Sequence, residues 1–249
     1  MSRPTGDLSN SEEGEFTVGV VVPAAGSGQR MGGLAKPFLE LSGEPILMRA
    51  LRPFLDHSGV REVVVSLPAA DAESPPAWLI EADQRIRVVA GGETRRDSVW
   101  AGLQVLSDAL DVAVVHDAAR PLVSRDVVGR CIDLAGRGLG GVAGVPAVDT
   151  IKEVDGDGRI VATPDRSRLW YAQTPQAFPL GVIMDAYRRA FTEDFPATDD
   201  AALVERAGGQ VVMVESSEEN LKITRPEDLE IAEFMLSRSS VRSPSLEGR

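Results

Sequence analysis

Short apolar segments rich in β-branched residues alternate along the chain with longer segments of helical periodicity. Strands that are apolar on both faces and are separated by helices are typical of a parallel sheet covered by helices on both sides. The pattern therefore predicts an α/β fold with a mainly parallel, doubly wound, Rossmann-like sheet. We expect strands at Val18–Val22, Glu62–Leu67, Ile86–Val89, Val112–Val115, Gly141–Val145 and Gln210–Val214, and helices at Ile46–Leu55, Ser98–Leu106, Val127–Leu134, Val182–Phe191, Ala201–Ala207 and Leu229–Leu236.

One segment interrupts this alternation. Val148–Val154 and Arg159–Ala162 flank the sequence Asp155-Gly156-Asp157-Gly158, and Asp-Gly supplies the positive φ angles of a tight turn. This predicts a protruding β-hairpin arm over about residues 147–165. Because a two-stranded arm is marginally stable alone, we expect it to pack on a second subunit.

Composition narrows the classes of protein to consider. The chain has 26 Lys and Arg residues against 38 Asp and Glu residues, a formal net charge of −12, whereas nucleic-acid-binding domains are usually basic. The longest apolar run, Val18–Ala25, is too short for a membrane span of about 20 residues. The single cysteine, Cys131, excludes an internal disulfide. We therefore expect a cytoplasmic protein with no nucleic-acid or membrane partner.

The two ends of the chain differ from its body. Residues 1–15 are polar and residues 237–249 are rich in Ser and Arg, so neither segment carries enough apolar surface to fold. No internal repeat or long linker divides the rest. The sequence predicts a disordered N-terminal tail (1–15), one domain (16–236) and a disordered C-terminal tail (237–249).

A loop of small residues follows the first predicted strand. Residues 23–28 read Pro-Ala-Ala-Gly-Ser-Gly, and the backbone amides of such a loop can approach and bind phosphate groups. The dinucleotide fingerprint fails because Met31 stands at its third glycine position, and the P-loop fails because Leu34 stands where lysine is required. Arg30 and Lys36 supply cations instead. The loop therefore predicts a triphosphate held by amides and clamped by two basic side chains.

Four more motifs follow this loop in the chain. They are Gly91–Val99, His116–Pro121, Leu169–Gln176 and Asn220–Leu229. With the loop, they resemble the nucleotidyltransferases and, among these, the 2-C-methyl-D-erythritol 4-phosphate cytidylyltransferase family of the methylerythritol phosphate route to isoprenoids. The resemblance covers about residues 18–236. It implies transfer of CMP from CTP to the sugar-alcohol phosphate, with release of pyrophosphate.

The resemblance also assigns roles to residues at the matching positions. Arg30 and Lys36 would stabilise the transition state at the α-phosphorus, and Arg166 and Lys222 would position the acceptor for attack. Such reactions depend on alignment and on stabilising negative charge. The residues implied in CTP binding are Pro23, Ala24, Ala25, Gly26, Ser27, Gly28, Gly92 and Ser98.

The acceptor would be contacted by a second set of residues. The resemblance implies Asp117, Thr150, Arg166, Thr174 and Lys222 for this role. A carboxylate beside phosphates is unfavourable unless a cation intervenes, so we also expect Mg²⁺, with Asp117 as a metal ligand or a substrate contact. In the family the hairpin arm reaches a partner subunit, which implies a homodimer with Thr150 and Arg166 acting in trans.

Simpler roles compete with several of these assignments. Lys222 could be a solvated loop charge, Arg166 could pair with Asp165 or a glutamate, and Ser98 could be a helix N-cap. His116 is expected to be structural, and Lys152 to be a surface charge of the arm.

Other functions also compete. Ribitol-5-phosphate cytidylyltransferase is the nearest alternative. A dinucleotide-dependent oxidoreductase and a silent nucleotide-binding regulator are less favoured, the first because of Met31 and the second because Arg30, Lys36, Arg166 and Lys222 are all present.

Overall fold

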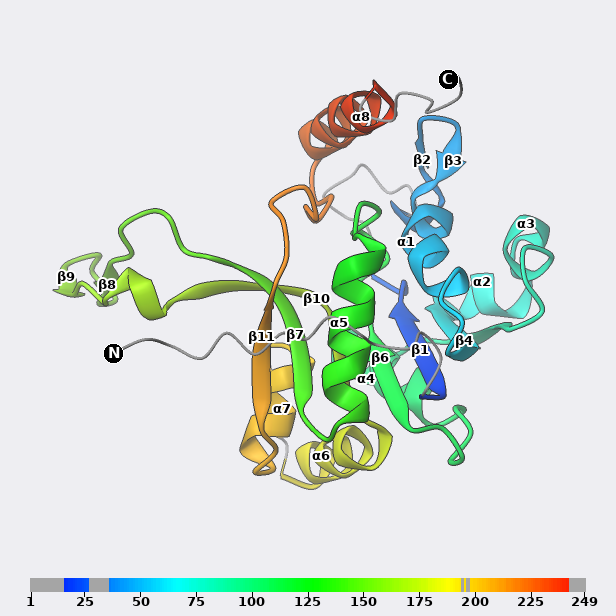
Figure 1. Ribbon diagram of the computed structural model, residues 1–249, viewed down its shortest axis with the longest axis horizontal. Helices are drawn as coiled ribbons and strands as arrows, with labels where there is room; N and C mark the ends of the chain where they lie inside the picture. Colours follow the sequence, from blue (N-terminus) through cyan, green and yellow to red (C-terminus); the bar gives the residue numbers. More distant parts are fainter. Residues whose placement is uncertain (1–15, 27–35, 194, 196–197, 242–249) are drawn as a thin grey trace, which may run out of the picture.

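Seven strands form the central sheet of the protein. The computed structural model describes residues 16–26, 36–193, 195 and 198–241. In these residues the strand order is β11-β7-β10-β6-β1-β4-β5 (Figure 1), and every neighbouring pair is parallel except those made by β10. The strands are β1 (Val18–Pro23), β4 (Val60–Leu67), β5 (Ile86–Ala90), β6 (Val112–Val115), β7 (Gly140–Pro146), β10 (Trp170–Pro179) and β11 (Val211–Glu215). The predicted α/β fold is confirmed.

Helices cover both faces of the sheet because alternate strand residues point to opposite sides. In β1, Val20 and Val22 pack in one apolar cluster with α1 (Ile46–Leu55) and α5 (Arg125–Gly136). Val21 packs in the other cluster with α4 (Arg95–Leu103), α6 (Leu180–Glu193) and α7 (Asp200–Arg206). All are fully buried, which explains why the sequence of β1 is apolar throughout.

Smaller elements complete the described structure. A third cluster joins the last helix, α8 (Pro226–Val241), to the ribbon formed by β2 (Glu40–Leu41) and β3 (Glu44–Pro45). Two short helices, α2 (Ala69–Glu73) and α3 (Ala77–Ile80), follow β4, and the 3-10 helix η2 (Lys36–Phe38) precedes β2. None of the described helices is long and apolar enough to cross a membrane.

The long strand β10 was not among the strands predicted from the sequence. It runs antiparallel between β6 and β7 and carries Gln173, Thr174 and Gln176. These polar residues interrupt the apolar pattern that marks the other strands, yet each is buried because its side chain has hydrogen-bond partners. Tertiary partners therefore allowed a polar segment to form a central strand.

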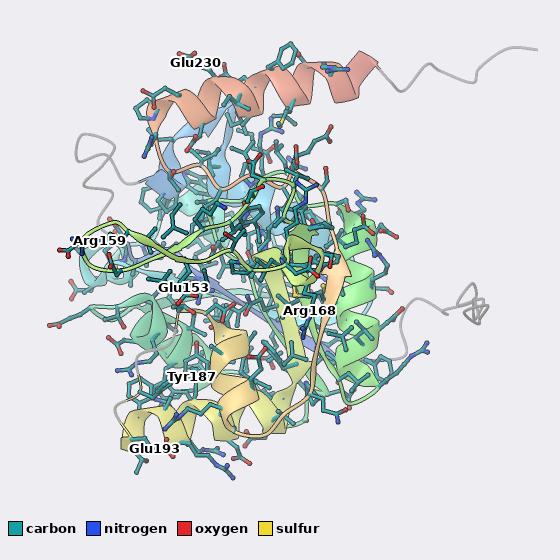
Figure 2. All side chains as sticks on the ribbon, turned by 90° about the vertical axis from the view of Figure 1, so that its left-hand side faces the viewer. Glu153, Arg159, Arg168, Tyr187, Glu193 and Glu230 are labelled. Carbon is teal, nitrogen blue, oxygen red and sulfur yellow. The ribbon has the colours of Figure 1, made fainter. Side chains whose placement is uncertain are left out.

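The predicted arm is present and leaves the sheet between β7 and β10 (Figure 1). Its paired residues are β8 (Glu153–Val154) and β9 (Ile160–Ala162), fewer than expected, and the turn places Gly158 at a φ of 79°. The segment between the sheet strands also contains η3 (Arg166–Arg168). It therefore extends past residue 165. Figure 2 looks along the arm, with Glu153 and Arg159 labelled on it.

Several predicted helix boundaries were wrong by two or more residues, and two of them bear on the domain limits and on the site. Helix α8 continues through residue 241, so the first five residues of the segment 237–249 are helical and do not form a disordered tail. Helix α4 begins at Arg95, three residues before the predicted start at Ser98, because Thr94 and Asp97 form a capping box there. Residues 1–15 and 242–249 lie outside the described residues.

Candidate active site

A pocket of about 490 Å³ lies at the carboxyl edge of the parallel strands. The segments after β1, β5 and β6 meet there with the segment between β11 and α8, as expected for ligand sites in such sheets. Eight of the residues predicted for the site line this pocket together: Pro23, Ala24, Ala25, Gly26, Gly92, Ser98, Asp117 and Lys222.

The glycine loop is described only in part. Ser27, Gly28 and Arg30 lie outside the described residues, so their predicted roles stay predictions. The backbone of Lys36 begins the 3-10 helix η2, and its side chain lies outside the described part of the chain. The next residue, Pro37, lines the pocket. Lys36 therefore immediately precedes, in sequence, a residue that lines the pocket.

Close backbone approach brings β5 against the start of the glycine loop. A Cβ atom on Gly91 would lie 2.5 Å from the Cβ of Ala25 and 2.8 Å from the Oγ of Ser98, distances that no side chain tolerates. A Cβ atom on Gly92 would collide with the Cβ of Asp97 at the start of α4. The two glycines therefore let the loop after β5 lie between the glycine loop and α4.

Ser98 does not cap α4, and the capping alternative was wrong. Thr94 is the N-cap, because its hydroxyl accepts a hydrogen bond from the amide of Asp97. The buried hydroxyl of Ser98 donates to the carbonyl of Thr94 at 2.9 Å and accepts from the amide of Gly92 at 3.2 Å. Ser98 therefore fixes the pocket edge that contains Gly92.

Asp117 lies directly after β6 and is paired with cations through both carboxylate oxygens. Oδ1 accepts from Nε of Arg95 at 3.0 Å, and Oδ2 lies 2.8 Å from Nζ of Lys222 and 3.8 Å from Nε of Arg120. Burial disfavours the charged carboxylate, but the charges of Arg95 and Lys222 outweigh burial and hold the pKa of Asp117 well below its usual range. The side chain of Lys222 is 42% exposed, so it remains open to solvent as a loop charge would be, and it also pairs with Asp117 at the pocket.

This pairing bears on the predicted metal ligand. Mg²⁺ takes carboxylate oxygens that can turn toward it, whereas both oxygens of Asp117 are already held by cations. Among the described residues, no group of three or more His, Cys, Asp or Glu side chains could hold a metal ion. Asp117 as arranged here does not fit the role of a magnesium ligand.

His116 and Thr174 support Asp117 from within the sheet. The hydroxyl of Thr174 accepts from the amide of Asp117 at 2.9 Å and lies 3.2 Å from Nδ1 of His116. Nε2 of His116 lies 3.0 Å from the carbonyl of Arg120. Complete burial lowers the pKa of His116 to about 4, so the ring is neutral, and a proton on Nε2 satisfies every partner. His116 is structural, as expected, and the hydroxyl of Thr174 is buried behind Asp117 and absent from the pocket lining.

The predicted acceptor contacts on the arm lie apart from this pocket. Thr150 is exposed, and Nη1 of Arg166 donates to the carbonyl of Val148 at 2.6 Å. Asp165 accepts from the amide of Ser167 and caps η3. Lys152 donates to Thr163 on the arm surface, as expected of a surface charge. Neither Thr150 nor Arg166 lines the pocket of its own chain.

Several residues of the site had no role in the sequence analysis. Arg95 lines the pocket and pairs with both Asp117 and Asp200. Asn220 is buried and donates from Nδ2 to Gln173 and to the carbonyl of Thr174. The position of Arg95, three residues after the glycine pair Gly91-Gly92 at a strand end, was the available signal. No local signal marks Asp200, because its partner Arg95 is 105 residues away.

Comparison with known proteins agrees with this geometry. The family model described as 2-C-methyl-D-erythritol 4-phosphate cytidylyltransferase matches residues 18–238. A relative of that name from Symbiobacterium thermophilum is 46% identical over 227 residues, which cover 91% of this chain and 95% of the relative. Another from Syntrophus aciditrophicus is 41% identical, with 89% and 97% covered.

Solved structures show the same fold. The 4-diphosphocytidyl-2C-methyl-D-erythritol synthase from Anaerococcus prevotii superposes with a TM-score of 0.81 at 28% identity, covering 90% of this chain and 97% of that one. The 2-C-methyl-D-erythritol 4-phosphate cytidylyltransferase from Thermus thermophilus gives a TM-score of 0.75 at 34% identity, with 89% and 100% covered. The chain belongs to the 2-C-methyl-D-erythritol 4-phosphate cytidylyltransferase family.

Proposed function

We propose that this protein transfers CMP from CTP to 2-C-methyl-D-erythritol 4-phosphate, releasing pyrophosphate and forming 4-diphosphocytidyl-2-C-methyl-D-erythritol for isoprenoid precursors. The observation that carries the proposal is one pocket that joins a backbone loop of small residues (Pro23–Gly26) to the cationic group around Asp117. The ribitol 5-phosphate alternative gains no support from the family model or from the relatives named above.

The reaction needs alignment more than covalent chemistry. A phosphate oxygen of the acceptor attacks the α-phosphorus, the bond to the β-phosphate oxygen breaks, and pyrophosphate leaves with that electron pair. Cations close to the phosphates stabilise the growing negative charge. Lys222 and Arg95 line the pocket on either side of Asp117, so we assign Lys222 to the acceptor phosphate. Arg30 and Lys36 are assigned to the α-phosphorus from the sequence.

The nucleotide would lie on the opposite side of the pocket. Small residues after β1 leave room for the triphosphate, and Gly92 with Ser98 forms an edge of fixed backbone groups for the base. A purine would leave such groups unpaired, which is an effective way to reject it. The proposal includes Mg²⁺, which would offset the negative charge of the triphosphate, and a cytoplasmic location.

A homodimer is also part of the proposal. The arm exposes apolar side chains, with Val154 52%, Ile160 62% and Val161 58% exposed, and a concentration of apolar surface on a projecting hairpin is typical of a contact site. A second copy of the chain would cover these residues. Arg166 and Thr150 would then reach the pocket of the partner.

The first prediction concerns the acceptor. Purified protein with CTP and Mg²⁺ should release pyrophosphate when 2-C-methyl-D-erythritol 4-phosphate is added, and far less with ribitol 5-phosphate. A coupled pyrophosphate assay measures both rates, with ATP replacing CTP as the matched control. Release that requires ribitol 5-phosphate would overturn the proposal.

The second prediction concerns the arm. Arg30→Ala and Arg166→Ala are each expected to be inactive, but a dimer containing one of each keeps one intact site if Arg166 acts in trans. A fully exchanged equal mixture should therefore recover about a quarter of wild-type activity. Arg159→Ala, which removes an arginine that pairs with Asp157 on the same arm, is the control and should remain active alone. Mixed dimers, confirmed by mass spectrometry, that stay inactive would reject the shared site.

A further inference from the structure

Arg95 joins two buried carboxylates that come from distant parts of the chain. Its Nη1 and Nη2 donate to Oδ1 and Oδ2 of Asp200 at 3.1 and 2.8 Å, and its Nε donates to Oδ1 of Asp117 at 3.0 Å. The guanidinium is therefore held in two directions at once. Asp117 faces the pocket, whereas Asp200 does not line it.

Asp200 provides a rigid anchor for this arginine. Its side chain is 0% exposed, and the hydroxyl of Tyr187 donates to its Oδ1 at 2.5 Å. Burial and the charge of Asp200 raise the pKa of Tyr187 well above its ordinary value, so the hydroxyl keeps its proton. Tyr187 is itself buried and stacked on Trp100, and Figure 2 labels it among the helices below the arm.

The first residues of α7 are also held by contacts that do not involve Arg95 or Tyr187. The carboxylate of Asp199 caps the helix by accepting from the amide of Ala202 at 3.0 Å. The side chain of Gln176, from β10, donates to Asp199 and accepts from the amide of Ala201, both at 2.9 Å. Asp200, the first residue of α7, is therefore held by its backbone as well as by its side-chain partners.

Fold stability alone does not explain why the chain keeps these charges. Removing charged groups from water is costly, and well-packed apolar residues often stabilise a core as well as a buried ion pair does. The fork of Arg95 is fixed on Asp200, however, and this fixes the direction of its Nε donor in a way that a flexible lysine would not. That donor binds one oxygen of Asp117, whose other oxygen holds Lys222.

We propose that Arg95 is a positioning residue: anchored from behind by Asp200 and Tyr187, it orients the carboxylate of Asp117 and thereby places the ammonium of Lys222 for the acceptor phosphate. The inference rests on the proposed function, because it assigns Lys222 to the acceptor. The inference also gives a role to Asp200 and Tyr187, which lie behind the pocket and are absent from its lining. Substitutions there test positioning without removing a group from the pocket wall.

The main test uses Asp200→Asn and Tyr187→Phe. A misplacement of about 1 Å at a reacting group can lower the rate about 100-fold. We therefore expect Asp200→Asn to reduce kcat/KM for the acceptor strongly and Tyr187→Phe to reduce it moderately. The dissociation constant for CTP should stay nearly unchanged in both. Asp185→Asn, which affects an exposed ion pair on the same helix as Tyr187, is the matched control.

A double-mutant cycle shows whether the anchor acts through Asp117. If it does, adding Asp200→Asn to Asp117→Asn should cost little beyond the single Asp117→Asn change. Independent effects would instead multiply. Tyr187→Phe keeps the ring that stacks on Trp100, so it provides a second variant if Asp200→Asn does not fold.

The three lysines of the chain allow a readout that does not depend on activity. Protein labelled with ¹³Cε-lysine should give signals from Lys36, Lys152 and Lys222, assigned with Lys→Arg variants. We expect Asp200→Asn and Asp117→Asn to move the Lys222 signal in the same direction and to leave that of Lys152 in place.

The outcomes separate the two proposals. The positioning role would be overturned by any one of three results. These are an unchanged Lys222 signal in Asp200→Asn, a double variant whose loss of kcat/KM equals the product of the two single losses, or equal losses of CTP binding and acceptor turnover. A wild-type protein that releases no pyrophosphate would instead refute the proposed function, and the lysine signals would still decide the link between Asp200 and Lys222.

Discussion

Replacing Asp117 by Asn is expected to lower kcat/KM for the acceptor by about 100-fold or more. The reason is that Arg95 and Lys222 lose the charged partner that fixes their positions in the pocket. The carboxylate is paired with Arg95 at 3.0 Å and with Lys222 at 2.8 Å. An asparagine has the same shape, but its Nδ2 group would point a donor at one of these donors. We also expect a loss of about 3 kcal/mol in the free energy of unfolding at neutral pH, because a buried pair loses one partner.

The stabilisation that Asp117 provides is expected to depend on pH in one direction. The folded state holds the pKa of Asp117 well below its ordinary value of 3.8, so the unfolded chain binds this proton more readily. The stabilisation is therefore complete above about pH 5 and is lost as the pH falls through and below 3.8. The stability difference between wild type and Asp117→Asn should shrink over that window.

Urea denaturation at a series of pH values measures this difference, and steady-state kinetics measures the acceptor effect. Asp126→Asn is the matched control, because that carboxylate is 74% exposed and pairs with Arg130 on the helix surface. It should cost less than about 1 kcal/mol. An Asp117→Asn protein as stable as this control would show that the cations around Asp117 do not need its charge.

Gly92→Ala is expected to weaken CTP binding at least about 10-fold, because it forces apart two parts of the nucleotide site. The new Cβ atom would collide with the Cβ of Asp97, whose carboxylate accepts hydrogen bonds from Thr94 at the start of α4. Overpacking of this kind typically costs about 1–3 kcal/mol. Because Gly92 lines the pocket, the backbone shift would move the groups assigned to the base.

Isothermal titration with CTP measures that loss, and thermal unfolding shows how much of the cost appears as stability. Gly129→Ala is the matched control, since no atom lies within 4 Å of a Cβ built there, in the middle of α5. That change should leave CTP affinity intact and stabilise the helix by up to about 1 kcal/mol. Unchanged CTP affinity in Gly92→Ala would remove Gly92 from the nucleotide site.

Strand prediction succeeded where burial on both faces left a continuous apolar sequence. All four residues of β6 are buried, and Val20, Val21 and Val22 of β1 pack alternately against the two helical layers. Strand β10 escaped prediction because Gln173, Thr174 and Gln176 satisfy their polar groups with partners 23 to 58 residues away. No local pattern contains that information.

In the site, too, local sequence predicted some features and contacts between distant residues decided the others. Local sequence determined the chemistry: a small-residue loop after β1, a paired glycine after β5 and an aspartate after β6 are each recognisable from a few adjacent residues. It also determined the parallel sheet, and parallel strands bring such loops to one edge.

Only the tertiary structure decided the state of each charged group. Ion pairing depends on distance in space, and Arg95 meets Asp117 and Asp200 across 22 and 105 residues of chain. The structure thereby paired both oxygens of Asp117 with cations, buried the hydroxyl of Thr174 and left His116 neutral. The sequence alone thus determined which groups reach the carboxyl edge of the sheet, and packing decided which of them face a ligand and which position the others.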